Sequence, residues 1–74
     1  MTASMKLTLK PSPGAILRVI GLAERRGYDP VRLQADHDEG ILTVQMTVLA
    51  HRPIRILVRQ FEKLFGVEQV EILS

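Results

Sequence analysis

Apolar and polar residues alternate along four stretches of this chain. A period of two residues is typical of a half-buried strand, and we predict strands over residues 5–10, 31–37, 41–49 and 67–73. In the first of these strands Met5, Leu7 and Leu9 share the inward face. We expect residues 1–4, which precede the first predicted strand, to form a flexible N-terminal tail.

Two other stretches repeat their apolar residues at the spacing of an α-helix. Residues 13–26 carry one apolar stripe, formed by Ile16, Val19, Ile20 and Ala23. Residues 53–65 carry a longer stripe, formed by Ile54, Leu57, Val58, Phe61, Leu64 and Phe65. Gly27 and Gly66 follow these stretches, and a glycine there ends a helix readily in the left-handed conformation.

The predicted order of elements is therefore β-α-β-β-α-β. Right-handed crossovers place both helices on one face of a four-stranded antiparallel sheet, which is the ferredoxin-like arrangement of the α+β class. Residues 5–74 form a single domain under this prediction, because no repeat or low-complexity run divides them. The fold alone does not define a function.

Size and composition narrow the classes of function. A chain of 74 residues builds only a small core, and such domains are often completed by self-association or by a partner. The absence of cysteine excludes thiol catalysis, thiolate metal sites and disulfides. No leader and no apolar run of ~20 residues is present, so we expect a soluble, cytoplasmic protein without membrane contact. Only three residues are aromatic, too few for the stacking platforms of a nucleic-acid-binding sheet, so we expect no nucleic acid.

The start of the first predicted helix has chemistry of its own. Ser12 suits the N-cap, because its hydroxyl can accept a free N–H of the first turn, and Pro13 suits the first helical position. Gly14 lets the backbone approach a bulky group. Free N–H groups at the positive end of the helix dipole attract a carboxylate. The pattern therefore indicates either an anion site or only a well-made cap.

The same stretch carries a family resemblance. Residues 13–22 (PGAILRVIGL), followed by Arg25-Arg26-Gly27-Tyr28, resemble the first half of an ACT domain, in the version of the regulatory small subunits of acetolactate synthase (acetohydroxyacid synthase). Residues 59–70 (RQFEKLFGVEQV) resemble the second helix and the last strand of the same subunits. The likeness covers residues 5–73, and the chain is most similar to the short, isozyme II type.

This resemblance implies a non-catalytic regulatory subunit, with residues 5–74 as a single ACT domain that forms a homodimer through a sheet edge and the first helix. Such a subunit binds and activates the thiamine-diphosphate-dependent catalytic subunit in branched-chain amino-acid synthesis. Thiamine diphosphate, Mg and FAD would all belong to that partner. The alternative is a free-standing ACT domain that senses a small amino acid for another enzyme or regulator.

The resemblance also implies an effector site. In several family members valine or a related amino acid binds between two ACT domains, at the loop before the first helix. By position, the site here would consist of Ser12, Pro13, Gly14, Ala15 and Ile16, with Asp29 from across the dimer.

Two positions depart from the valine-responsive pattern. Pro11 stands where that pattern has asparagine, and Tyr28-Asp29-Pro30 stands where it has Tyr-Asn-Ile. Proline can donate no hydrogen bond, and aspartate attracts an ammonium group but repels a carboxylate. We therefore expect weak or absent valine feedback, with the activating role retained.

The outer face of the second predicted helix carries a basic ridge, which we define as Arg55, Ile56, Arg59 and Lys63. Its three basic residues follow at intervals of four, and each like-charge pair disfavours an isolated helix by about 0.2–0.5 kcal/mol. The ridge either docks on an acidic surface of the catalytic subunit or is a solvated face whose charge Glu62 partly offsets.

Other candidate residues are weaker. Gly21 costs the first helix about 0.8–1 kcal/mol relative to alanine, which indicates either close packing on another chain or simple tolerance. His37 lies among Asp36, Asp38 and Glu39, but without the spacing of a defined ligand set, so we expect no metal. No serine or carboxylate has an evident base and orienting partner, so we expect no catalytic residues.

Overall fold

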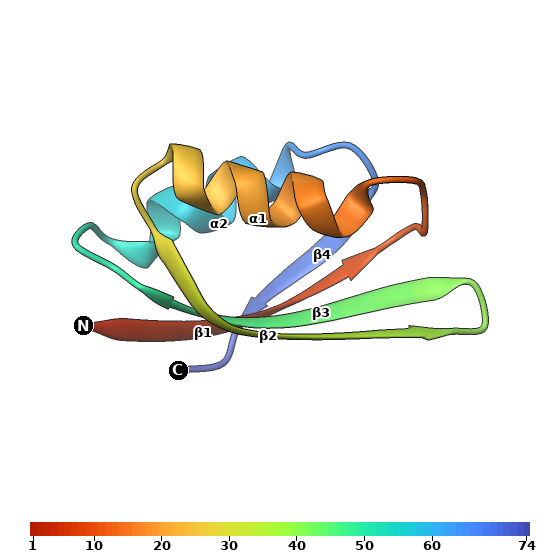
Figure 1. The fold of residues 1–74 in the computed structure, drawn as a ribbon, viewed down its shortest axis with the longest axis horizontal. Coiled ribbons are helices and arrows are strands. Elements are labelled where there is room, and N and C mark those ends of the chain that lie inside the picture. The colour runs from red at the N-terminus through yellow and green to blue at the C-terminus, as the bar shows by residue number, and fades with distance from the viewer.

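Six elements follow one another in the predicted order. The computed structural model describes all 74 residues, as β1 (Thr2–Leu9), α1 (Ala15–Arg25), β2 (Asp29–Asp38), β3 (Ile41–Leu49), α2 (Ile54–Glu62) and β4 (Val67–Ile72). The strands form one antiparallel sheet in the order β2-β3-β1-β4. Both helices cover the same face of this sheet (Figure 1), which confirms the predicted ferredoxin-like arrangement.

The core lies between the helices and the covered face of the sheet. The central strands β1 and β3 alternate as predicted, and Met5, Leu7 and Val44 are fully buried. From the helices, Leu57 and Phe61 are fully buried against them. One hydrophobic cluster of 16 residues therefore joins both layers.

Polar contacts fix the far end of α1. Tyr28 is fully buried, and its hydroxyl donates to the Pro53 carbonyl oxygen at 2.9 Å, as a buried phenol requires. Arg26 donates from Nη2 to Oε1 of Gln60 at 3.1 Å. These bonds tie the end of α1 and the start of β2 to α2.

The connection between β2 and β3 is a tight hairpin. Glu39 and Gly40 both have positive φ, 51° and 76°. Two successive residues of this conformation match the right-handed twist of the flanking strands.

Neither helix has the length and apolar character that crossing a lipid bilayer requires.

Two predicted boundaries are wrong. Residues 2–4 belong to β1 rather than to a flexible tail, because β3 extends to Leu49 and pairs with Thr2, and Ala3 is buried. The second helix ends at Glu62, so Phe65 lies beyond it and is 76% exposed instead of completing the apolar stripe. Residues 2–4 continue the alternation of β1, but their side chains are small, and the predicted strand therefore did not include them.

Candidate functional site

The loop between β1 and α1, together with the first turn of α1, contains five of the six predicted effector residues. The N-cap of α1 is Gly14 and not Ser12, and Gly14 has a φ of 75° in the left-handed region. Ser12 forms no side-chain cap; its carbonyl oxygen accepts the Ala15 N–H at 3.1 Å. Pro13 likewise precedes the helix. The predicted cap is wrong because the loop makes an additional turn before the helix begins.

Arg18 holds this loop in place. Its guanidinium donates to the Pro13 carbonyl oxygen at 2.8 Å and to Oγ of Ser12 at 2.6 Å. It also lies 5.7 Å from the centroid of the Phe65 ring, a cation–π contact of about 0.5–1 kcal/mol at an exposed site. Arg18 lies outside the apolar stripe of α1, and these two loop groups fix the position of its side chain.

The first turn of α1 keeps backbone donors free. The first intrahelical bond runs from the Arg18 N–H to the Gly14 carbonyl oxygen at 2.9 Å. The N–H groups of Ile16 and Leu17 reach no acceptor in the chain. Because these groups also lie at the positive end of the helix dipole, this end of α1 can accept an anionic group.

A hollow of about 430 Å³ adjoins this end of α1, and we name it the helix-start hollow. Four of the six predicted effector residues line it, namely Ser12, Gly14, Ala15 and Ile16. Leu17 of α1 and His37 of β2 also line it, although neither was predicted. His37 could not be inferred from the sequence, because β2 is distant from this loop along the chain.

The structure does not bring the other two predicted effector residues into this hollow. Pro13 is exposed on the loop beside it. Asp29 begins β2 beyond the far end of α1, a helix of 11 residues that is about 16 Å long. Within one chain Asp29 therefore cannot meet the helix start, and its contribution from across a dimer stays a prediction.

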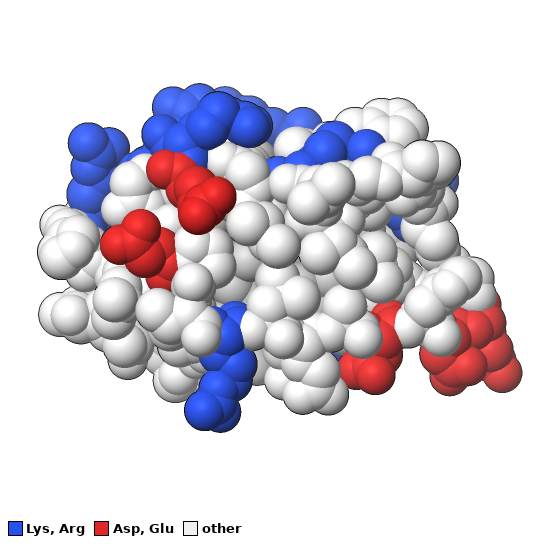
Figure 2. All heavy atoms as spheres, in the orientation of Figure 1, with Lys and Arg blue, Asp and Glu red and all other residues white.

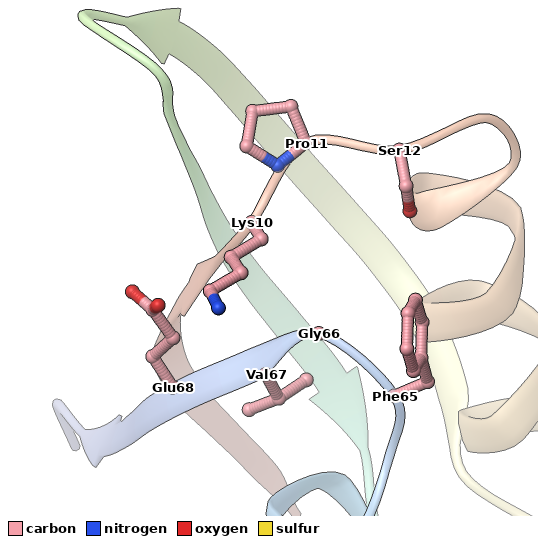
Figure 3. Close-up of a pocket in the computed structure, with 7 residues that line it drawn as sticks. All are labelled: Lys10, Pro11, Ser12, Phe65, Gly66, Val67 and Glu68. Atoms are coloured by element: carbon pink, nitrogen blue, oxygen red, sulfur yellow. The ribbon is translucent and has the colours of Figure 1, made fainter.

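A second hollow lies on the other side of the same loop, and Figure 3 shows its lining. It measures about 400 Å³ and forms where the β1–α1 loop meets the α2–β4 loop, so we name it the two-loop hollow. Lys10 and Ser12 line it from the first loop, Phe65 and Gly66 line it from the second, and Glu68 lines it from the start of β4. No periodicity in the sequence indicated it, because its two walls are far apart along the chain.

The residues around His37 do not form a cluster. His37 pairs with the buried Leu42 of β3, so it lies on the face of β2 that the helices cover. Asp36 and Asp38 lie on the opposite face. No group of three His, Asp or Glu side chains lies close enough together to hold a metal ion.

The basic ridge lies on the outer face of α2. Arg55, Arg59 and Lys63 are exposed, as is Ile56 at 44%. Lys63 is the C-cap residue, so the ridge runs along the whole helix. The predicted outward orientation of these four residues is confirmed, and their role in docking stays a prediction.

These features define a small ferredoxin-like domain with an open helix start and one uncovered basic helix face. The family model of the ACT domain matches residues 11–70, and the chain therefore belongs to the ACT-domain family. The ACT domain is a regulatory domain. A search among curated proteins finds no match to the chain.

Solved structures share this fold. The ACT domain from a GTP pyrophosphokinase of Chlorobium tepidum is similar with a TM-score of 0.85 and 17% identity, over 99% of this chain and 97% of that one. The acetolactate synthase small subunit of Thermotoga maritima is similar with a TM-score of 0.87 and 21% identity, over 100% of this chain but only 48% of that one. An ACT domain protein from Streptococcus pneumoniae has a TM-score of 0.81 and 19% identity, over 100% of this chain and 89% of that one. At these identities the likeness concerns the fold.

Replacing Gly14 with alanine is expected to lower the free energy of unfolding by about 1–2 kcal/mol, because an L-residue is strained in the left-handed conformation. A new Cβ would be 3.5 Å from Nη1 of Arg18, an ordinary contact, so the cost is one of backbone conformation. Gly14→Asn serves as the control, because asparagine adopts this conformation more readily and loses less. Urea unfolding measures both variants, and an alanine variant as stable as the parent would contradict the loop conformation.

Proposed function

We propose that this chain is a non-catalytic regulatory subunit, dimeric through a sheet edge and the first helix, which binds and activates the catalytic subunit of an acetolactate synthase. The catalytic subunit, with its thiamine diphosphate, Mg and FAD, would carry out the chemistry of branched-chain amino-acid synthesis. The motifs at residues 13–28 and 59–70 support this branch of the ACT family, and so does the similar fold of the acetolactate synthase small subunit.

The observation that carries the proposal is the basic ridge, which belongs to a helix layer with an excess of basic residues. Residues 15–26 and 52–63 hold seven of the ten Lys and Arg residues against two of the eight acidic ones, a net charge of +5. The rest of the chain carries three basic and six acidic residues, a net charge of −3. Figure 2 shows basic atoms gathered over the helices and acidic atoms at the hairpin end, with further acidic atoms at the opposite end beside the helices. A helix layer of this sign favours an acidic protein surface as its partner.

The dimer would use the β2 edge. β2 is an edge strand of 10 residues, and an exposed edge of this length pairs readily with another strand. Leu17 is 74% exposed on α1, and the helix-start hollow places it on the same side as His37 of β2. Gly21 lies one helical turn further along this flank, so β2 and α1 together offer one continuous surface to a second copy.

Replacing Gly21 with alanine is expected to raise the helix stability by about 0.8–1 kcal/mol while weakening the dimer about fivefold or more. Within the chain the new Cβ would meet only Nη1 of Arg25 at 3.1 Å, the mobile end of a side chain. A methyl group at a closely packed interface, in contrast, pushes two copies apart. Sedimentation equilibrium gives the dimer Kd, with Glu24→Ala as a matched control on the outer face. Equal dimer affinity in both variants would remove this flank from the interface.

An amino-acid effector would bind in the helix-start hollow. The free N–H groups of Ile16 and Leu17 suit its carboxylate, and Asp29 of a second copy would face its ammonium group. Pro11 provides no donor, which supports weak or absent valine feedback.

A second candidate function is a free-standing ACT domain that senses a small amino acid for another enzyme or regulator. The observation in its favour is the likeness to the ACT domain of the GTP pyrophosphokinase, which covers nearly the whole of both chains. Affinity purification of the tagged chain from its own cells separates the two proposals. The first predicts recovery of a large thiamine-diphosphate enzyme, and repeated recovery of a different enzyme would replace it with the second.

A further inference from the structure

β4 is an edge strand, and no other strand of the sheet covers its outer side. It pairs only with β1 and ends the strand order (Figure 1). It contains neither proline nor lysine, the residues that commonly protect such an edge. A bulge leaves Glu68 without a partner on β1, but residues 69–72 beyond it pair regularly. The outer side of β4 is therefore open to an additional strand.

Alternate residues of β4 direct their backbone groups to this open side. In an antiparallel pair, residues that exchange hydrogen bonds alternate with residues whose N–H and C=O groups point away from the neighbour. The Ser4 carbonyl oxygen of β1 accepts the Leu73 N–H at 2.8 Å, so the residues of β4 that bond to β1 are the odd-numbered ones. The N–H and C=O groups of Val70 and Ile72 therefore point outward, and no loop or turn bonds to them.

The apolar side of this edge is incompletely covered. Ile72 pairs with Met5, and Met5 is fully buried whereas Ile72 is 46% exposed. Val67 and Val70 are half-buried and pair with buried residues of β1, so they lie on the same face as Ile72. Apolar side chains of an added strand would remove this area from water, which favours binding.

The edge is also acidic. Residues 67–74 hold two glutamates and no basic residue. A hollow of about 190 Å³, which we name the α2–β4 hollow, is lined by the carboxylates of Glu62 and Glu68 and by Val67 and Val70. The stem of a lysine or arginine can lie on the two valines while its charged end meets the two carboxylates.

The charge of β4 disfavours a second copy of this chain as the occupant. Two β4 strands paired antiparallel about residues 69 and 70 would place Glu68 opposite Glu71 of the second copy, and the symmetry would repeat this contact. Like charges directly opposite one another destabilise a strand pair, whereas opposite charges stabilise it. The chemistry of the edge therefore selects a basic strand.

We propose that the outer edge of β4 binds an extended basic segment of another protein by strand addition. The segment bonds to the backbone of Val70 and Ile72, covers their apolar side chains and places a lysine or arginine in the α2–β4 hollow. This surface is separate from the basic ridge, which favours an acidic partner, and from the β2 edge at the other end of the sheet.

The test is a titration of the ¹⁵N-labelled chain with a short peptide in which valine alternates with lysine. Saturable amide shifts are expected at residues 62 and 67–72. At saturation, exchange of the Val70 and Ile72 amides with water slows about tenfold or more, because both become donors to the peptide. Exchange at Gln69 and Glu71 changes little, since these residues already bond to β1.

Two pairs of variants separate the backbone from the charges. Ile72→Pro removes an outward donor without affecting the bonds to β1, and it is expected to bind about tenfold more weakly than Ile72→Ala, or by about 1.4 kcal/mol. Ile72→Ala is the matched control, because it loses the same side chain and keeps the N–H. The double variant Glu68→Gln and Glu71→Gln is also expected to lose about tenfold, with Glu24→Gln on the outer face of α1 as its control.

A peptide with glutamate in place of lysine is expected not to bind. Absence of saturable shifts, shifts centred on the acidic hairpin at residues 36–39, or unchanged exchange at Val70 and Ile72 would overturn the proposal. Slowed exchange in the chain alone that increases with its concentration would assign the edge to a second copy and also overturn it. If Ile72→Pro does not fold, the exchange measurement on the parent decides. The titration needs no catalytic chain, so its outcome is independent of whether a catalytic partner is recovered.

Discussion

Replacing Phe61 with alanine is expected to lower the free energy of unfolding by about 3–5 kcal/mol. Phe61 is fully buried between α2 and the sheet, and truncation of such a ring removes its transfer free energy and leaves a cavity. A domain of this length has a total stability of about 4–11 kcal/mol, so the variant is expected to be partly unfolded at room temperature. Urea unfolding followed by circular dichroism measures the loss.

Phe65→Ala provides the matched control, four residues further along the chain. Phe65 is mostly exposed and loses only the contact with Arg18, so a decrease of less than about 1 kcal/mol is expected. Similar losses in the two variants would contradict the assignment of one ring to the core and the other to the surface.

Replacing Arg59 with glutamate is expected to weaken activation of the acetolactate synthase catalytic subunit at least about tenfold, or about 1.4 kcal/mol. The change places a negative charge in the middle of the basic ridge, where like charges across an interface are repelled. The quantity to measure is the concentration of variant that gives half-maximal stimulation.

The control for this variant is Lys6→Glu, the same change in charge on the uncovered face of the sheet. Lys6 lies opposite Glu71, and the like-charge pair costs less than about 1 kcal/mol of stability. Circular dichroism confirms that both variants fold. Unchanged stimulation by Arg59→Glu, or an equal loss with Lys6→Glu, would remove the ridge from the docking surface.

The architecture could be predicted from the sequence because the central elements bury one face each. The strand Ile41–Leu49 has the predicted bounds, since its alternate residues Leu42, Val44, Met46 and Val48 all face the helices. The two helices likewise bury one face each, and their apolar residues repeat at a period of 3.6 residues. A periodic pattern of apolar residues indicates which residues contact the core. It does not predict the structure of residues that make no contact with the core.

The errors in the predicted structure occur mainly at residues outside the core. Thr2 and Ser4 are polar, and they are strand residues because they pair with Leu49 and Thr47 of β3. Phe65 fits the apolar spacing, but the helix ends three residues before it. Arg18 fits an outward position, but a hydroxyl and a carbonyl oxygen of the loop bind it. Each outcome depends on a contact with a different element, which local periodicity does not contain.

The candidate site was predictable only in part for the same reason. Ser12 to Ile16 are contiguous, so a resemblance over one short stretch could indicate them together. His37 reaches the helix-start hollow through the pairing of β2 with β3, and Glu68 reaches the two-loop hollow through a bulge. These positions depend on how strands that are distant in the sequence pair with one another, which local periodicity does not contain.

The central claim is that this chain performs no chemistry itself and acts by contact with a catalytic chain. The direct measurement is acetolactate formation by the purified catalytic subunit of the same organism, with increasing amounts of this chain added. The account predicts a rise in activity that saturates near a fixed ratio of the two chains, with no activity from this chain alone. A folded preparation that leaves the rate unchanged at every ratio would contradict it.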